Sequence, residues 1–252
     1  MTRVGPEEAR PSRSSVALAA LGVLALLLFV GLVGLGVWQV QRRAWKLDLI
    51  AQIDARIHAA PIEAPGPPAW SSIDAAHDAY RRVRAAGVFL NDRETLVQAA
   101  TALGGGYWVL VPLQTDAGFT ILVNRGFVPP ERADPTHHGA ERIAARAQVT
   151  GLLRVTEPKG GFLRDNDPAA DRWRSRDVAA IAQKRGLSDA APYFIDADAL
   201  PGGDGPIGGL TVVDLPNNHL VYALTWFALA AMVVGAAGYV ARDEWRRHQQ
   251  AR

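Results

Sequence analysis

Aromatic, basic and imidazole side chains gather beside the two longest apolar runs of the sequence. In chain order they are Trp38, Arg42, Arg43, His219, Tyr222 and Trp226. A neutral imidazole can ligate haem iron as an axial ligand, aromatic rings can flank a porphyrin, and guanidinium groups can pair with its propionates. On this interpretation His219 is the metal ligand and the other five side chains contact the cofactor.

The same residue types have a second interpretation. Tryptophan and tyrosine are ordinary anchors at the boundary between a membrane and water. His219 can equally cap a helix or lie among lipid headgroups, because an imidazole at a membrane edge is not specific to one role. The residue types alone leave haem ligation and membrane anchoring both open.

Two apolar runs must position these side chains. Residues 16–37 contain no charged residue, and residues 220–240 contain none either. A helix of roughly 20 apolar residues spans the hydrocarbon core of a bilayer, so both runs predict transmembrane helices. The first run is longer than the apolar region of a cleaved signal peptide, and no small-residue cleavage site follows it. Buried core helices of a soluble protein are the alternative, but charged residues flank both runs.

Basic residues beside the second run predict its orientation. Residues 187–219 contain acidic residues but no Lys or Arg, whereas Arg242, Arg246 and Arg247 follow the run. Because basic residues favour the cytoplasmic side, residues 241–252 are expected to form a cytoplasmic tail. With two spans, residues 1–15 form a second cytoplasmic tail and residues 38–219 face outward. The expected location is a bacterial inner membrane with a periplasmic domain, or the mitochondrial inner membrane in a eukaryote.

The outward-facing residues 38–219 predict an α+β domain with a mostly antiparallel sheet. Strands are expected at 82–90, 94–99, 107–113, 119–128, 148–155 and 192–196, and a helix at 177–185 that ends at Gly186. Short polar connections between apolar segments are typical of hairpins. The glycines at 104–106 predict a turn, and Ile50, Ile53 and Ile57 extend the first helix to about His58.

The composition excludes several classes of protein. The chain has no cysteine and only two methionines, which excludes thiolate metal sites, covalent haem attachment and a Met-rich copper site. The net charge of +2 predicts no nucleic-acid partner. No phosphate-binding loop, nucleophile elbow, dinucleotide fingerprint or zinc-protease motif occurs, so we do not expect an enzyme.

Two short polar motifs have both a metal-binding and a bland interpretation. His137-His138 is a possible metal pair, but it lies in a polar stretch without an obvious third ligand, which favours a solvated loop. Asp165-Asn166-Asp167 resembles the start of a calcium loop, but the required downstream glycine and glutamate are missing. A capped turn is the better prediction for the second motif.

Segments spread over nearly the whole chain resemble one protein family. They are Gly36-Val37-Trp38-Gln39 with Arg42 and Trp45-Lys46, residues 107–113, residues 122–129 with Asn124-Arg125-Gly126-Phe127, residues 158–173, and residues 217–226 with Asn217-Asn218-His219-Leu220. In this combination the chain resembles the Surfeit-locus (Surf/Shy) cytochrome c oxidase assembly protein family. One departure is Phe127, where the family usually carries tryptophan.

This resemblance implies a role in the biogenesis of haem–copper cytochrome c oxidase. Members promote assembly of the catalytic subunit, and bacterial members are thought to bind haem a and to help deliver it. The resemblance therefore implies transient haem a with His219 as its ligand, and it implies the oxidase catalytic subunit, haem a synthase and the lipid bilayer as partners.

Two other functions remain open from the sequence. The first is a scaffold that binds no haem and stabilises an assembly intermediate of the oxidase. The second is an envelope sensor, against which the short tails 1–15 and 241–252 count, because neither is long enough for an output domain.

Overall fold

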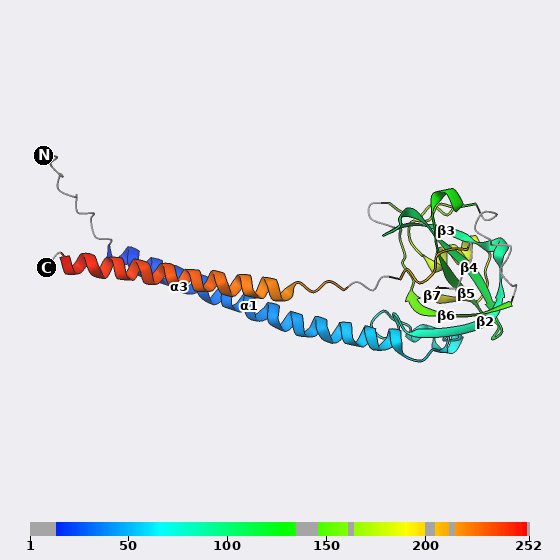
Figure 1. The fold of residues 1–252 in the computed structure, drawn as a ribbon, viewed down its shortest axis with the longest axis horizontal. Helices are drawn as coiled ribbons and strands as arrows, with labels where there is room; N and C mark the ends of the chain where they lie inside the picture. Colours follow the sequence, from blue (N-terminus) through cyan, green and yellow to red (C-terminus); the bar gives the residue numbers. More distant parts are fainter. Residues whose placement is uncertain (1–13, 135–145, 161–163, 200–204, 212–214, 251–252) are drawn as a thin grey trace. The chain divides into compact units, whose positions relative to one another are not determined.

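The computed structural model describes residues 14–134, 146–160, 164–199, 205–211 and 215–250. The chain divides into two compact units, of which the first contains residues 1–50 and 215–252 and the second contains residues 51–214. The first unit is a pair of helices and the second is rich in strands (Figure 1). Each unit has a separate architecture and packing.

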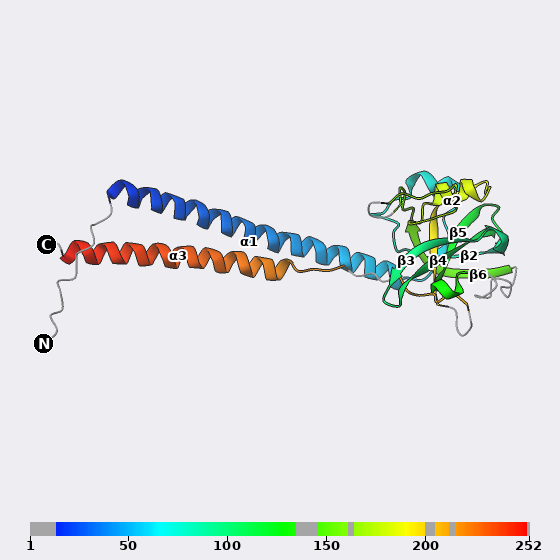
Figure 2. The same cartoon turned by 90° about the horizontal axis from the view of Figure 1, so that it is seen from above.

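The first unit consists of α1 (Ser15–His58), up to residue 50, and α3 (His219–Gln250). The two helices lie side by side and run antiparallel in both views (Figures 1 and 2). Both are long and apolar enough to cross a membrane, as judged by length and composition. The predicted extension of the first helix to His58 is confirmed, and α3 continues well past the apolar run.

A seam of buried and half-buried residues runs along the facing sides of the helix pair. Its members near the start of α3 are Gly36, Gln39 and Arg43 of α1 with His219, Ala223, Trp226 and Ala230 of α3. Alternating intervals of three and four residues are the repeat of two helices that pack with a left-handed supercoil. This seam brings the end of the apolar run of α1 next to the first turn of α3.

The helices separate toward the beginning of α1 and the end of α3 (Figure 2). Between them lies an apolar cavity of about 580 Å³, lined by small residues such as Gly22, Ala25, Ala237 and Ala241. The buried carboxyl-bearing residue Glu244 also lines this cavity. The helix pair is therefore closely packed at the His219 end and open at the opposite end.

The second unit is built on one seven-stranded sheet. Its strands are β1 (Ile62–Glu63), β2 (Arg82–Phe89), β3 (Thr95–Thr101), β4 (Gly104–Thr115), β5 (Thr120–Val128), β6 (Arg146–Val155) and β7 (Ala190–Ala197), in the order β1-β2-β6-β7-β5-β4-β3. β2 also pairs with β4, which closes five of the strands into a barrel. The pairs β1–β2 and β5–β7 are parallel and the others are antiparallel.

The closure between β2 and β4 depends on a glycine. Gly87 pairs with Thr115, and a Cβ atom at Gly87 would lie 2.1 Å from the carbonyl oxygen of Gln114. Any larger residue would collide with the backbone of β4. The barrel therefore closes at a position where only glycine allows the two backbones to approach.

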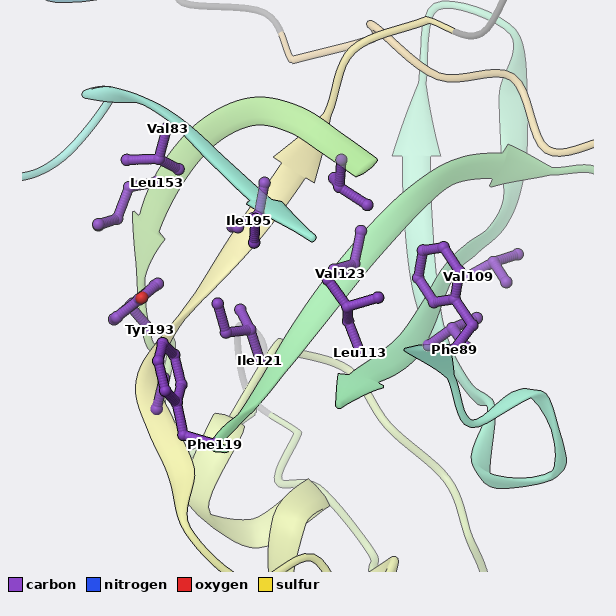
Figure 3. Close-up of a cluster of buried hydrophobic side chains, with 14 of the residues drawn as sticks. Val83, Phe89, Val109, Leu113, Phe119, Ile121, Val123, Leu153, Tyr193 and Ile195 are labelled. Atoms are coloured by element: carbon purple, nitrogen blue, oxygen red, sulfur yellow. The ribbon is translucent and has the colours of Figure 1, made fainter. Parts of the chain in front are cut away.

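Alternate residues of the strands build two hydrophobic clusters. One fills the barrel, with Phe119, Ile121, Val123, Tyr193 and Ile195 among its members (Figure 3). The other packs the opposite face of the same strands against helix α2 and Trp173, and is formed by Val97, Leu110, Leu122, Trp173, Val178, Ile181 and Phe194. Because strand side chains alternate between faces, β4, β5 and β7 contribute to both clusters.

Helix α2 (Val178–Lys184) confirms the predicted helix. Asp177 caps it by accepting a hydrogen bond from the Ala180 backbone N–H at 3.1 Å, and Gly186 follows with a φ of +62°. Among the described residues of the second unit, α2 is the only α-helix apart from the last turns of α1. The domain is therefore more strand-rich than the α+β prediction, while the mostly antiparallel sheet is confirmed.

The predicted turn at Gly104–Gly106 is wrong. These glycines begin β4, and the hairpin turn is formed by Ala102 and Leu103. A Cβ atom at Gly106 would lie 2.3 Å from the Val128 carbonyl oxygen and 2.6 Å from the Phe127 ring. Gly106 therefore makes room for β5 and Phe127, whereas a Cβ atom at Gly104 or Gly105 would meet nothing within 4 Å.

Candidate functional site

His219 lies in the first turn of α3 and contacts α1. Its Nδ1 atom is 2.7 Å from Oε1 of Gln39. An amide oxygen can only accept a hydrogen bond, so in this arrangement Nδ1 carries the hydrogen and donates it. In the neutral imidazole this leaves Nε2 with its lone pair, which is the form in which a histidine binds a metal ion.

Two buried polar atoms of residues close to His219 in the chain lack a hydrogen-bond partner among the residues that the structure describes. Within the described part of the chain, the Trp226 indole Nε1 and the Asn217 Oδ1 are buried and have no hydrogen-bond partner. Trp226 lies on the α3 seam seven residues after His219, and Asn217 lies two residues before it. A buried polar group without a partner is rare in native proteins and requires an explanation. A bound molecule that supplies an acceptor at Trp226 is one such explanation.

Gly36 lets the two helices approach beside this site. A Cβ atom at residue 36 would lie 2.5 Å from Cε1 of Phe227. The Phe227 ring therefore rests on the backbone of α1 one turn before Gln39. The close contact at Gly36 holds Gln39 and His219 at the same level of the helix pair.

The structure does not bring all of the predicted site residues together. Trp38 and Tyr222 are both more than half exposed. Arg42 is exposed, and its guanidinium lies 3.9 Å from the centre of the Trp45 ring on the same exposed side of α1. Arg43 is half-buried on the seam. His219, Trp226 and Arg43 therefore share the interhelical seam, whereas the other three predicted residues lie outside it.

Gln39 is the residue that sequence reasoning missed. It belongs to the Gly36–Gln39 segment that carried the family resemblance, but no chemistry was assigned to it. The signal that could have found it is the spacing of Gly36, Gln39 and Arg43 by three and four residues, which places a small, a neutral polar and a basic residue on one helix face.

The other metal-binding candidates do not extend this site. No group of three or more metal-binding side chains occurs in the ranges that the structure describes. His137 and His138 lie outside those ranges. Asp167 forms the predicted capped turn, since its carboxylate accepts from the Ala170 N–H at 3.1 Å and from Arg172 at 2.7 Å.

The barrel unit contains a cluster of buried polar groups around Asp196. This carboxylate is 3 % exposed. Its donors are Asn124 Nδ2 at 2.8 Å, Arg154 Nη1 at 2.7 Å, Thr211 Oγ1 at 3.0 Å and Arg176 Nη1 at 3.3 Å. A buried charge with this many partners is satisfied, and the cluster ties strands β5, β6 and β7 to the segment at Thr211.

The Asn124–Phe127 segment of the resemblance belongs to the same structural arrangement. Asn124 binds Asp196, and Phe127 exchanges two backbone hydrogen bonds with Ile207, each of 2.9 Å. Gly126 has a φ of +133°, and a Cβ atom there would lie 2.4 Å from the Ile207 carbonyl oxygen. This segment therefore fastens residues 205–211 to the barrel. Phe127 is buried and stacks edge-on against Trp108.

A carboxyl group with a strongly shifted pKa lies in the barrel unit. Burial raises the pKa of Glu94 to about 7, although the positive charges of Arg125 and Arg185 act in the opposite direction. Burial also lowers the pKa of Arg125, and the charge of Glu94 opposes that change. The Arg125 guanidinium lies 5.7 Å from the centre of the Phe89 ring. These groups belong to the second unit and are not part of the His219 site.

Comparison with known proteins places the chain in a family. A sequence model of the SURF1 family matches residues 26–231, which include most of α1, the first part of α3 and the whole barrel. The chain is 38% identical to Surfeit locus protein 1 of Homo sapiens over 226 residues, covering 82% of this chain and 72% of the human protein. It is 37% identical to Surfeit locus protein 1 of Mus musculus (79% and 68% covered) and 36% identical to a SURF1-like protein of Monosiga brevicollis (85% of both chains). The chain therefore belongs to the SURF1 family.

Proposed function

We propose that the protein is a membrane-anchored assembly factor for haem–copper cytochrome c oxidase that aids delivery of haem a to the catalytic subunit. Membership of the SURF1 family supports the assembly role, through the function that the resemblance to Surfeit-locus assembly proteins implies. The proposed partners are the oxidase catalytic subunit, haem a synthase and the lipid bilayer. The protein acts as a carrier or chaperone and not as an enzyme.

The membrane arrangement in this proposal has residues 16–37 and 220–240 as the two spans. Both helices have the required length and composition, and large apolar side chains such as Leu27 and Leu224 are exposed along them. Exposure of these apolar side chains to water would be unfavourable, whereas in a bilayer they contact lipid. The basic residues after the second span put both termini in the cytoplasm and the barrel on the outer side. The proposed location is the bacterial inner membrane, or the mitochondrial inner membrane in a eukaryote.

The observation that carries the haem part is the hydrogen bond between His219 Nδ1 and Gln39 Oε1. In the neutral imidazole this would leave the Nε2 lone pair available to hold the haem iron, and the unpartnered Trp226 N–H lies on the same seam. Haem a supplies the redox centre of the oxidase once it is inserted there. One protein ligand suits a carrier, because the cofactor must leave again.

The experiment that tests this proposal compares two histidines of α3. The full-length protein is produced in cells that make haem a, and the haem spectrum of the purified protein is recorded. We expect His219→Ala to lose most of the bound haem. His248→Ala, an exposed position near the end of the same helix, should retain it. Equal haem content in both variants would show that His219 is not the ligand.

A scaffold that binds no haem is the second candidate function. The exposure of Trp38, Trp45 and Tyr222 favours it, because exposed aromatic side chains at the end of a span are typical membrane anchors. In that case the purified protein is free of haem, while deletion of the barrel still blocks oxidase assembly. Deletion of the gene separates the two functions: a carrier leaves the catalytic subunit short of haem a, whereas a scaffold leaves an unstable subunit.

A further inference from the structure

We propose that Gln39 is a positioning residue that holds His219 in its Nδ1–H tautomer and so directs Nε2 toward the haem iron. The tautomer part concerns the protein by itself, and the iron part rests on the proposed haem-carrier function. Nothing in the family resemblance assigns a role to Gln39.

The first argument is the burial of Gln39. The residue is 9 % exposed, although a glutamine in a helix that faces lipid would ordinarily turn its amide toward water. Among the described residues, its contact with His219 is the one side-chain hydrogen bond between α1 and α3. The amide is therefore placed at the seam in order to bind the imidazole.

The second argument is the direction of that hydrogen bond. The amide oxygen accepts, so the imidazole donates from Nδ1, and in the neutral ring the other nitrogen is left as a base. Ligating histidines in proteins have this arrangement as a rule: the nitrogen that does not bind the metal donates to an oxygen atom. The acceptor fixes the ring orientation and increases the electron density on the ligating nitrogen.

The third argument is the close packing of the two helices around the Gln39–His219 contact. The Phe227 ring rests on Gly36, one turn before Gln39, and Ala223 is buried one turn after His219. Small side chains at these two positions hold the helices close, which keeps the 2.7 Å hydrogen bond from opening. Gln39 and His219 therefore act as one preorganised ligand group.

Ordinary helix–helix association is the competing explanation, since polar side chains hydrogen-bond across membrane helices without any ligand. The two explanations differ for Gln39→Glu and Gln39→Leu. A positioning role needs an acceptor, so Gln39→Glu keeps the tautomer and makes the imidazole a stronger donor of electron density. A role in association alone predicts changes in stability, with no change in the electronic properties of a bound haem.

The test uses the full-length protein in detergent with ¹⁵N-labelled histidine. Imidazole ¹⁵N chemical shifts report the tautomer of His219 without haem, and purified haem a is then titrated into the protein. In the wild type we expect the Nδ1–H tautomer. In Gln39→Leu we expect a mixture of tautomers, haem a affinity lower by about 10–100-fold and a higher reduction potential. Gln39→Glu should bind haem a with a reduction potential below that of the wild type. Gln41→Leu, an exposed glutamine two residues along α1, is the matched control and should match the wild type.

The outcomes separate this inference from the proposed function. Binding of haem a that depends on His219 but is equal in Gln39→Leu and Gln41→Leu overturns the role of Gln39 and leaves the carrier function intact. The Nε2–H tautomer in the wild type also overturns it. Absence of haem binding in every variant refutes the carrier function and with it the iron part of the inference.

Discussion

The Asp196 cluster of the barrel and the His219 seam of the helix pair differ in how far their buried polar atoms are hydrogen-bonded. Asp196 is almost fully buried and accepts hydrogen bonds from four side chains. On the seam, only His219 and Gln39 satisfy each other, while Trp226 Nε1 and Asn217 Oδ1 have no partner among the described residues. The Asp196 carboxylate has its hydrogen bonds within the protein, whereas, in the part of the chain that the structure describes, two buried polar atoms of the seam region lack them.

This difference indicates what each region does. A satisfied buried network rigidifies a fold and specifies how its segments join, which is the role of Asp196 between three strands and Thr211. Proteins depart from full satisfaction mainly at functional sites, where a ligand supplies the missing partners. The comparison therefore gives the Asp196 cluster a structural role and supports the proposed ligand binding at the seam.

Removal of the Asp196 carboxylate should have the largest effect. Asp196→Ala leaves the largely buried guanidinium groups of Arg154 and Arg176 with Glu157 as their one remaining charged partner among the described residues. Loss of one partner of a buried ion pair costs about 3–5 kcal/mol of unfolding free energy. Urea unfolding of the full-length protein in detergent, followed by near-UV circular dichroism, measures this loss.

Asp198→Asn is the matched control for that prediction. Asp198 is two residues along the chain and pairs with Arg82, but both side chains are partly exposed. Exposed ion pairs contribute about 0–1 kcal/mol, so the control should unfold close to the wild type. Equal destabilisation by the two substitutions would show that the Asp196 cluster is not the structural centre of the barrel.

Gly36→Ala should disrupt the packing of α1 against α3 on the seam, just as Asp196→Ala should disrupt the barrel. The added methyl group collides with the Phe227 ring at 2.5 Å, so the helices must separate or the ring must turn. Such overpacking costs about 1–3 kcal/mol, and it should disrupt the Gln39–His219 hydrogen bond. The His219 tautomer and the haem content report the change. Gly34→Ala, where a Cβ atom would meet nothing within 4 Å, should leave both readouts unchanged.

A substitution at Glu94 tests whether the barrel also contains a group whose ionised form destabilises the fold. Its pKa is raised from 4.5 to about 7, chiefly by burial, so the folded protein binds this proton more tightly than the unfolded chain. The unfolding free energy should therefore fall as the pH rises from about 4.5 to about 7. Because Glu94 is partly exposed, the loss is on the order of 1–2 kcal/mol. Glu94→Gln should flatten this pH dependence.

Asp92→Asn is the control for Glu94, since this neighbouring carboxylate is 80 % exposed at its side chain. It should keep the pH dependence of the wild type. A Glu94→Gln protein that still loses stability between pH 4.5 and 7 would assign the titration to another group.

Local sequence patterns predicted the elements well. The alternation in β2, the polar connection between β4 and β5, and Asp177 with Gly186 around α2 are signals that lie within a few residues of the element they specify. The closure of the barrel could not be predicted, because the pairing of Val88 with Gln114 depends on contacts between residues far apart in the chain. For the same reason the glycines at 104–106 looked like a turn, although Gly106 accommodates β5 and Phe127.

The site was predicted in part. The position of His219 opposite the end of the first apolar run followed from the two-helix arrangement, since two membrane spans of opposite direction place those ends at one level. The partner of His219 did not follow, because the rotation of each helix about its axis is set by packing. Gly36 and Phe227 turn Gln39 toward His219, and they turn Trp38 and Arg42 away from it.

Trp226→Phe should have the smallest effect in the haem-free protein and therefore sharpens the comparison. The substitution removes an indole N–H that is buried without an acceptor, so the relief of desolvation offsets the lost packing, and the unfolding free energy should change by about 1 kcal/mol or less. If haem a supplies the acceptor, the same variant should bind it roughly three- to tenfold more weakly than the wild type, which corresponds to one ordinary hydrogen bond. Trp245→Phe, at an exposed position of α3, is the control for both measurements. A haem-free Trp226→Phe protein that lost more than about 2 kcal/mol would mean that the indole N–H already has a partner, and the contrast with Asp196 would then disappear.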